Sequence, residues 1–411
     1  MRIIRPMRIL DFIAQNKRWL FAGGLISFSS SYGQTFFISV FAGEIMDTFQ
    51  LTNGEWGGIY TLGTTASALL MLYGGTLSDR FRARTLSAIV LGLLALACLF
   101  MAVNSLVWLL PVVIFTLRFT GQGMLSHVSI VSIARWFSAA RGKALAISAL
   151  GFSVGESLLP ILFVSLLAVL PWRGLWVLAA GFTVILIPVV LILLKTERTP
   201  QSLAESSESL GMNGRHWTRP ETIRHWLFWM ILPTMTAPAI FSTSLYFQQV
   251  HLTATKGWDH AGFVALFPIY SITTILMNFV YGAALDRFGT GRLLAVFQVP
   301  MALAYFSFGF GTTLSAAALG FFLMGLMQGG ATLWGAFWAE YYGTKHLGAV
   351  KSLAMALMVF GSAIGPGITG ALIDLGIPFH QQMVYFGVYI LCACGLTHIA
   401  MRRAMPAIAA A

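Results

Sequence analysis

The sequence predicts an all-α membrane protein in which twelve transmembrane helices form two pseudo-symmetric bundles of six. Of its 411 residues, 57% are hydrophobic and only 9% are charged, and long apolar runs recur along the whole chain. A soluble domain carries about 25% charged residues, so this chain has too few polar side chains to cover itself in water. The apolar runs are continuous rather than alternating, which favours helices over the strands of a membrane barrel.

A helix needs about 20 apolar residues to cross a bilayer. Twelve segments meet this requirement, namely 19–43, 56–77, 85–104, 107–134, 144–168, 173–195, 226–250, 260–283, 293–311, 313–338, 351–374 and 379–401. The polar segment after the sixth span is rich in Ser and Glu, as expected of a linker. The predicted organisation is therefore an N-terminal six-helix bundle (1–195), a cytoplasmic linker (196–225) and a C-terminal six-helix bundle (226–411).

The end of this linker carries a signal for the start of a helix. Thr218 and Glu221 have the spacing of a capping box, in which each side chain bonds to the backbone of the other residue. Pro220 lies between them and suits the first turn of a helix. We therefore expect a short helix that leads into the seventh span.

The basic residues are distributed unequally between the two sides of the membrane. With the N-terminus in the cytoplasm, 22 of the 25 lysines and arginines lie on that side, Arg173 and Lys256 lie opposite, and Arg118 lies within a span. Cytoplasmic loops are enriched in basic residues, so we expect a multi-pass protein of the cell (inner) membrane with both termini in the cytoplasm. These residues lie in short loops rather than on one face, which argues against nucleic acid as a partner despite the net charge of +11.

The two halves of the sequence resemble each other. Gly75 and Asp79 match Gly282 and Asp286 at an offset of 207. At an offset of 206 the matching pairs are Gln122 and Gln328, Gly123 and Gly329, Gly142 and Gly348, Gly155 and Gly361, and Pro160 and Pro366. Several matches at nearly one offset indicate duplication, and parallel six-helix halves suggest a central pathway at the interface of the repeats.

The twelve spans, the long central loop and the loops GGTLSDRFRAR and YGAALDRFGTGR resemble the major facilitator superfamily. The stretch RWFSAARGKALAISALGFSVGESLLP and the small residues of the first span are most similar to bacterial relatives of monocarboxylate transporters and oxalate–formate exchangers. The resemblance covers essentially the whole chain and implies a secondary transporter.

Arg118 lies in the middle of the fourth span. It precedes Arg135 by 17 residues, which is about 25 Å of helix and too deep for its side chain to reach the interface easily. An ionisable group at this depth is costly and is a functional hypothesis by default. Arg118 either braces the helices or faces the pathway and holds an anion or a carboxylate. The equivalent residue of the tenth span is Met324, which favours a functional role.

Glu156 lies at a similar depth in the fifth span, about 20 Å from its cytoplasmic end. The preceding glycines, Gly142, Gly151 and Gly155, have the spacing of the superfamily's antiporter motif, but Glu156 stands where that motif has proline. This departure counts against a drug/proton antiporter. We predict that Glu156 couples transport to protons, and a static salt bridge with Arg118 is the alternative.

Neutral polar residues on other spans are candidate contacts for the substrate. In a regular helix, with about 100° per residue, Gln122, Ser129 and Ser132 share the side of Arg118, while His127 faces away and is expected to bond to a neighbouring helix. The full substrate-binding set is Arg118, Gln122, Gln34, Ser31, Gln248, Asn278 and Gln328. The eighth span has no arginine, unlike that of the related exchangers, which favours a small monoanion or a zwitterion over a dicarboxylate.

The charged loops that follow the second and eighth spans predict a gate. A charged turn at a helix end can pair with basic residues when the inner side closes, and a few kcal/mol suffice to bias the two populations. The predicted gating residues are Asp79, Arg80, Asp286, Arg287, Arg135 and Arg141.

The predicted function is secondary active transport of a small organic anion, monocarboxylate-like, by alternating access coupled to protons. The expected partners are this substrate, protons and the lipid bilayer, and the expected state is a monomer. A drug or metabolite exporter of the same fold is the first alternative, and a receptor with a transporter-like body is the second. The sequence contains no nucleotide-binding loop, metal-ligand spacing or nucleophile–base pair, so we expect neither a cofactor nor an enzyme.

Overall fold

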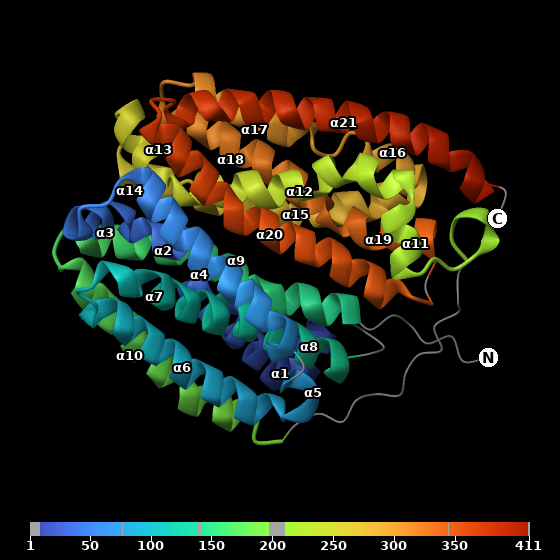
Figure 1. Ribbon diagram of the computed structural model, residues 1–411. Helices are drawn as coiled ribbons and strands as arrows, with labels where there is room; N and C mark the ends of the chain where they lie inside the picture. The colour runs from blue at the N-terminus through green and yellow to red at the C-terminus, as the bar shows by residue number, and fades with distance from the viewer. Residues whose placement is uncertain (1–8, 76, 138–140, 197–209, 344, 410–411) are drawn as a thin grey trace. The chain divides into compact units, whose positions relative to one another are not determined.

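The structure, a computed structural model, describes residues 9–75, 77–137, 141–196, 210–343 and 345–409, and every regular element in these ranges is helical (Figure 1). Ten of the described helices are long and apolar enough to cross a membrane. They match the third to twelfth predicted spans. The first two predicted spans correspond to a broken run that begins with α1 (Ile9–Ser29) and to α4 (Asn53–Gly74). The expected all-α membrane fold is confirmed.

The chain forms two compact units, which we describe one at a time. Unit 1 comprises Met1–Ile38, Gly63–Leu159 and Leu166–Glu205, and unit 2 comprises Ser39–Leu62, Pro160–Ser165 and Ser206–Ala411. The segment Ser39–Leu62, which includes the first part of α4, therefore belongs to the same unit as the C-terminal spans.

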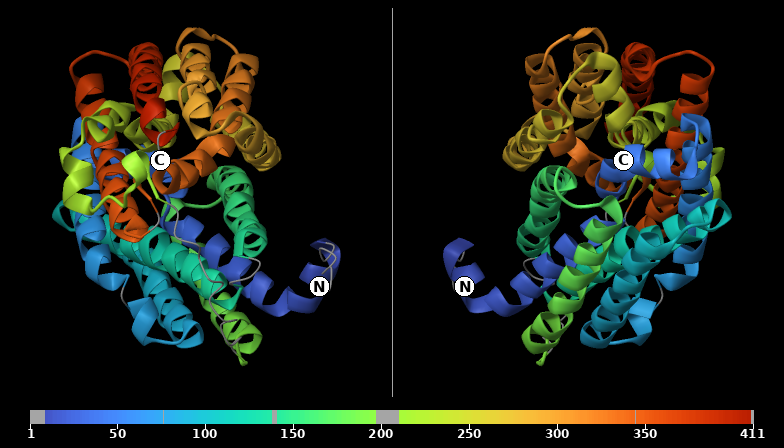
Figure 2. Two further views of the ribbon diagram at one scale, coloured as in Figure 1. Left: turned by 90° about the vertical axis from the view of Figure 1, so that its right-hand side faces the viewer. Right: turned by 90° about the vertical axis from the view of Figure 1, so that its left-hand side faces the viewer.

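Within the described residues, the long helices of unit 1 are interrupted in the first and fourth spans. Its elements after α1 are η1 (Ser30–Gly33), α2 (Thr35–Ile38), the second part of α4, α5 (Leu77–Arg80), α6 (Ala83–Val103), η3 (Val107–Leu109), α7 (Leu110–Leu117), η4 (Arg118–Leu125), α8 (Ser126–Trp136), most of α9 (Arg141–Leu167) and α10 (Trp172–Leu193). Helices α6 and α10 lie side by side (Figures 1 and 2), with Leu91, Leu94 and Trp176 fully buried. Arg173 closes one end of this pair because its Nη1 donates to the carbonyls of Ala102 and Asn104, at 2.8 and 2.5 Å.

Unit 2 contains the remaining helices. They are η2 (Ser39–Phe41), α3 (Ala42–Phe49), the first part of α4, η6 (Met212–Gly214), α11 (Arg219–Arg224), α12 (Trp226–Phe247), α13 (Gln249–Lys256), α14 (His260–Val264), α15 (Phe267–Phe288), α16 (Thr290–Leu294), α17 (Val299–Phe310), α18 (Leu314–Gln328), η7 (Gly329–Ala331), α19 (Thr332–Tyr342), α20 (Leu347–Asp374) and α21 (Phe379–Ala409). Among the described helices of this unit, the most extensive packing joins α17 to α21, α12 to α20, α17 to α18, and α15 to α18. Lys256 caps the end of α17, since its Nζ donates to the carbonyls of Gly309 and Gly311 at 2.6 and 2.8 Å.

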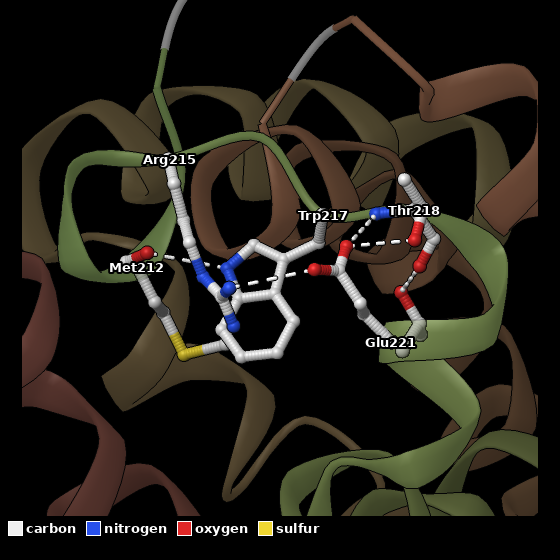
Figure 3. Close-up of polar contacts among 6 residues, drawn as sticks. Met212, Arg215, Trp217, Thr218 and Glu221 are labelled. Carbon is white, nitrogen blue, oxygen red and sulfur yellow. Dashed lines mark hydrogen bonds and ion pairs between the residues drawn. The ribbon is translucent and has the colours of Figure 1, made fainter.

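The segment before α12 confirms the predicted short helix α11 and its capping box (Figure 3). The Glu221 carboxylate accepts the Thr218 backbone N–H at 2.8 Å and the Thr218 hydroxyl at 2.7 Å. The Arg215 guanidinium stacks over the Trp217 ring, 4.0 Å from its centre. The Trp217 backbone N–H donates to the Tyr342 carbonyl at 3.0 Å, so this segment is fastened to the end of α19.

Candidate functional site

The first predicted span is not the continuous helix that its sequence suggests. Helix α1 ends at Ser29, a 3-10 turn follows over Ser30–Gly33, and Gln34 is extended with φ −87° and ψ 155° before α2 begins. Backbone that leaves the helical path at membrane depth survives only where protein buries it and satisfies its polar groups. The break therefore creates carbonyl groups that need donors from neighbouring elements.

Arg118 supplies one of these donors. Its side chain is only 1% exposed, and its Nη1 donates to the Gly33 carbonyl at 3.1 Å and lies 3.3 Å from the Thr35 hydroxyl. The guanidinium therefore links the fourth span to the broken first span. The sequence indicated the depth of Arg118 but not these partners, because the break at Gly33 was not expected.

The turn that carries Arg118 is a π-helix, η4, between the α-helical segments α7 and α8. The turn packs directly on η1, and a Cβ atom on Gly121 would lie only 2.6 Å from the Gly33 Cα. Glycine at both positions therefore permits the contact that brings Arg118 to the break. Short π-helical insertions occur frequently at functional sites because they change which side chains share a helix face.

This π-helical turn corrects the predicted polar stripe, which assumed a regular helix. Gln122 is half-buried, whereas Ser129 is buried in a helix interface. The Ser129 hydroxyl donates to the Gly23 carbonyl at 2.9 Å and lies 3.2 Å from the Ser148 hydroxyl. Ser129 thus joins α8 to α1 and α9. His127 bonds to a neighbouring segment as expected, since its Nε2 lies 3.1 Å from the Gly75 carbonyl.

Helix α9 brings Glu156 to the same broken turn. A Cβ atom on Gly155 would collide with the Ser31 hydroxyl, and one on Gly151 would collide with the Gly24 carbonyl, so α9 lies directly against the first span. Glu156 follows Gly155 and is only 6% exposed, and Ser31 is fully buried. Arg118 and Glu156 are therefore carried by two elements that both pack on η1.

The remaining predicted substrate contacts lie on several elements. In unit 1, Gln34 is half-buried at the break itself. In unit 2, Gln248 is buried at the end of α12, and its Nε2 donates to the Thr369 hydroxyl at 3.3 Å. Asn278 is exposed and Gln328 is half-buried. Their helices cross closely, because a Cβ atom on Gly329 would lie 2.9 Å from the Asn278 backbone nitrogen.

The described gating residues lie at the ends of helices, with Arg80 at the end of α5, Arg135 in the last turn of α8 and Arg287 in the last turn of α15. Arg135 Nη1 donates to the Ser78 carbonyl at 2.6 Å, which joins the end of α8 to α5. Arg80 and Arg287 are exposed, and the Arg287 guanidinium lies over the Phe288 ring. The side chains of three further predicted gating residues, Asp79, Asp286 and Arg141, lie outside what the structure describes.

Sequence reasoning missed a close contact within unit 2 between the first part of α4 and the end of α20. The Gly54 backbone N–H donates to Asp374 Oδ2 at 2.8 Å, and the Thr61 hydroxyl donates to the Ala363 carbonyl at 2.9 Å. Between these bonds, a Cβ atom on Gly57 would lie 2.5 Å from the Pro366 carbonyl oxygen. Small residues at helical spacing allow such contact between membrane helices, and they were the signal available in the sequence.

Two aromatic residues of α4 extend this contact to α12. The Trp56 ring stacks on Phe247 with 5.6 Å between ring centres, and the Tyr60 ring lies 4.7 Å from the same phenylalanine. Beside them, Gln249 Nε2 donates to the Ser39 hydroxyl at 2.8 Å. Among the described residues, no group of three or more His, Cys, Asp or Glu side chains could hold a metal ion.

Comparison with known families and structures identifies the type of protein. The family described as Major Facilitator Superfamily matches residues 23–269 and 234–406. A search of curated protein sequences gave no match. A bacterial homologue of the human lysosomal transporter Spinster, inward-facing and unoccupied, is similar with a TM-score of 0.71 at 15% identity, covering 95% of this chain and 98% of that one. A mutant form of the nucleoside transporter NupG is similar with a TM-score of 0.66 at 13% identity, covering 95% of this chain and 99% of that one.

Proposed function

The chain belongs to the major facilitator superfamily and is a membrane transporter rather than an enzyme, and we propose that it moves a small organic anion, monocarboxylate-like, by alternating access coupled to protons. The observation that carries this proposal is Arg118, a fully buried cation that holds the broken first span next to the helix of Glu156. Burying a cation at membrane depth is costly, and cations there mark substrate or ion pathways.

We assign the coupling to Arg118 and Glu156 acting together. A buried carboxylate loses its charge more readily than an exposed one unless a cation stabilises it. When Glu156 takes a proton, its attraction for the guanidinium falls, and Arg118 becomes available to a substrate carboxylate. One proton and one monoanion then move together without net charge. The proposed neutral donors to the substrate are Gln34, Gln122 and Ser31 of unit 1 and Gln248, Asn278 and Gln328 of unit 2.

The contact between α4 and α20 supports the alternating-access part of the proposal. The predicted topology places the protein in the cell (inner) membrane with both termini in the cytoplasm. In this topology, Gly54, Gly57 and Thr61 lie near the outer side of the membrane. Their bonds to α20 would have to break before that side could open. The charged loops with Asp79, Arg80, Asp286 and Arg287, and the basic residues Arg135 and Arg141, would govern the inner side.

Arg118 is tested by uptake of radiolabelled acetate and lactate into proteoliposomes. We expect Arg118→Gln to lower uptake by about 100-fold, because a charge-assisted hydrogen bond contributes up to about 3 kcal/mol. Arg118→Lys should retain part of the uptake, since it keeps the charge but loses the planar fork. Arg82, which is exposed at the start of α6, provides the matched control Arg82→Gln. Unchanged uptake by Arg118→Gln would make Arg118 only a brace.

Glu156 is tested by separating coupling from movement. We expect Glu156→Gln to abolish accumulation driven by a pH gradient while it spares counterflow, which needs no proton transfer. Wild-type accumulation should also be insensitive to membrane potential if proton and monoanion move one to one. Persistent proton-driven accumulation by Glu156→Gln would remove Glu156 from the coupling step.

A drug or metabolite exporter of the same fold is the second candidate. It is favoured by the glycines of α9, since Gly151 and Gly155 have the spacing of the antiporter motif and pack against the first span. Transport assays in vesicles of both orientations distinguish the two functions. A symporter accumulates substrate on the side toward which protons flow. A proton-driven exporter accumulates substrate on the side from which protons flow.

A further inference from the structure

A groove runs between α1 and α9 on the surface of unit 1, with a volume of about 720 Å³. Its floor includes Gly24 and Gly151, where the two helices touch because neither has a side chain. The N-terminal part of α1 runs outward from the other helices of the unit (Figure 2). The volume lies within the range of small-molecule sites, about 300–1,000 Å³.

The walls of this groove are apolar and are exposed or half-buried. They include Ile13, Phe21 and Leu25 of α1, Leu150 and Val154 of α9, and Leu193 at the end of α10. Phe21 is 58% exposed, Val154 is 46% exposed and Leu150 is 42% exposed. Because α9 is apolar enough to span a membrane, its exposed side chains in these walls are suited to contact with lipid chains.

One end of the groove is cationic. Lys17 and Arg18 both border it and are both exposed, about 10 Å along α1 from the glycine floor. The surface that they give to the groove is almost wholly apolar, so their charged ends lie at its rim. Arg18 Nη2 donates to the Ile192 carbonyl at 3.3 Å, and Trp19 Nε1 donates to the Thr196 carbonyl at 3.1 Å, so the end of α10 holds this part of α1 in place. Tryptophan and snorkelling lysine and arginine are typical of the level of lipid headgroups.

We propose that this groove binds one anionic phospholipid, with its phosphate at Lys17 and Arg18 and an acyl chain along the apolar walls. The argument is complementarity of charge and polarity along a single groove. An anionic headgroup meets two cations at one end, and a hydrocarbon chain meets Phe21, Leu150 and Val154 over the rest. A zwitterionic lipid fits the walls equally well, but its choline group opposes the cations. A soluble anion fits the cations but leaves the walls unoccupied.

The test measures lipid binding and involves no transport, so its failure is distinguishable from failure of the proposed function. Purified full-length protein is titrated with phosphatidylglycerol or phosphatidylcholine in mixed micelles, and native mass spectrometry and thermal unfolding report binding. We expect phosphatidylglycerol to bind about tenfold more tightly or better, since each nearby cation favours anionic lipid by about fivefold. A bound ligand raises the Tm by mass action.

Variants assign the binding to this groove. Lys17→Ala combined with Arg18→Ala should remove the preference for phosphatidylglycerol, and Val154→Trp should weaken both lipids by filling the groove. The matched control, Arg82→Ala, removes an exposed cation that does not line the groove and should change the preference less than twofold. Equal binding of the two lipids, or an unchanged preference in the double variant, would overturn the proposal. Equal stabilisation by inorganic phosphate would indicate an ion site, and loss of a dimer in Val154→Trp would indicate a second copy of the chain.

Discussion

Unit 1 and unit 2 share a glycine contact between helices, but they differ in the charged residues near this contact. In unit 1, Gly155 of α9 lies against Ser31 of the first span, and in unit 2, Gly361 of α20 lies against Ile240 of α12. The two glycines correspond at an offset of 206, and each precedes a proline within its helix by five residues. The charges differ, because Arg118 corresponds to Met324 and Glu156 to Ser362. Helix packing of this kind therefore does not require the charged pair.

A second comparison shows what a cation required by the fold looks like. Arg173 caps the carbonyls of Ala102 and Asn104 in unit 1. Lys256 caps those of Gly309 and Gly311 in unit 2, at an offset of 207. The two cations come from different places in the sequence, yet they satisfy equivalent helix ends. A cation that caps this helix end is therefore present in both halves, whereas the equivalent of Arg118 is absent from the C-terminal half.

Apart from substitutions of Arg118 and Glu156 themselves, the largest effect on stability should therefore come from these two caps. Arg173→Met and Lys256→Met each remove two hydrogen bonds to carbonyl groups, and we expect each to lower the free energy of unfolding by about 1–3 kcal/mol. Substrate counterflow per folded molecule should change little. Thermal unfolding and counterflow measured on the same preparations check this. A loss of transport without a loss of stability in either variant would break the comparison.

A smaller effect should follow from two adjacent glycines of α4. A Cβ atom on Gly57 would lie 2.5 Å from the Pro366 carbonyl oxygen, whereas one on Gly58 meets nothing within 4 Å. We expect Gly57→Leu to disfavour the contact with α20 by about tenfold, or about 1.4 kcal/mol. With Thr61 replaced by cysteine, the rate of thiol labelling at this position should rise in Gly57→Leu and stay unchanged in the control Gly58→Leu. Equal rates in both variants would count against α4 and α20 as a gate.

The smallest effect should come from titration at the end of unit 2, where Lys256 and His251 lie. Burial lowers the pKa of His251 below its ordinary value of 6.5, and the nearby His380 lowers this pKa further. The Asp374 carboxylate acts in the opposite direction and raises it. His380 also interacts with the charge of Lys256. The unfolded chain then binds this proton more readily than the folded chain. The contribution of His251 to the free energy of unfolding is therefore greatest above about pH 7. It falls as the pH drops through 6.5 to the lowered pKa.

Thermal unfolding between about pH 8 and pH 5 checks this sign. The wild type should lose more stability on acidification than His251→Gln, which cannot take up the proton. An equal loss in both proteins would place the pH dependence on other groups.

Sequence patterns predicted the long helices well because the hydrophobic effect and length alone decide a membrane span. They also predicted the capping box of Thr218 and Glu221, which depends only on local spacing. They missed the break at Gly33 and the π-helical turn at Arg118, because these depend on contact between Gly33 and Gly121, which are far apart in the chain. The depth of Arg118 was therefore readable from the sequence, whereas its bond to the Gly33 carbonyl was not.

The most direct test gives unit 1 the residues that unit 2 carries at the equivalent positions. Arg118→Met and Glu156→Ser are made singly and together, and Tm and pH-driven uptake of acetate and lactate are measured for each. In the proposed pairing of Arg118 with Glu156, removing one charge leaves the other buried alone, which costs about 3–5 kcal/mol, whereas removing both avoids this cost. We predict that the double variant folds, is more stable than either single variant and does not transport. A double variant that transports, or that is less stable than both single variants, would contradict the account.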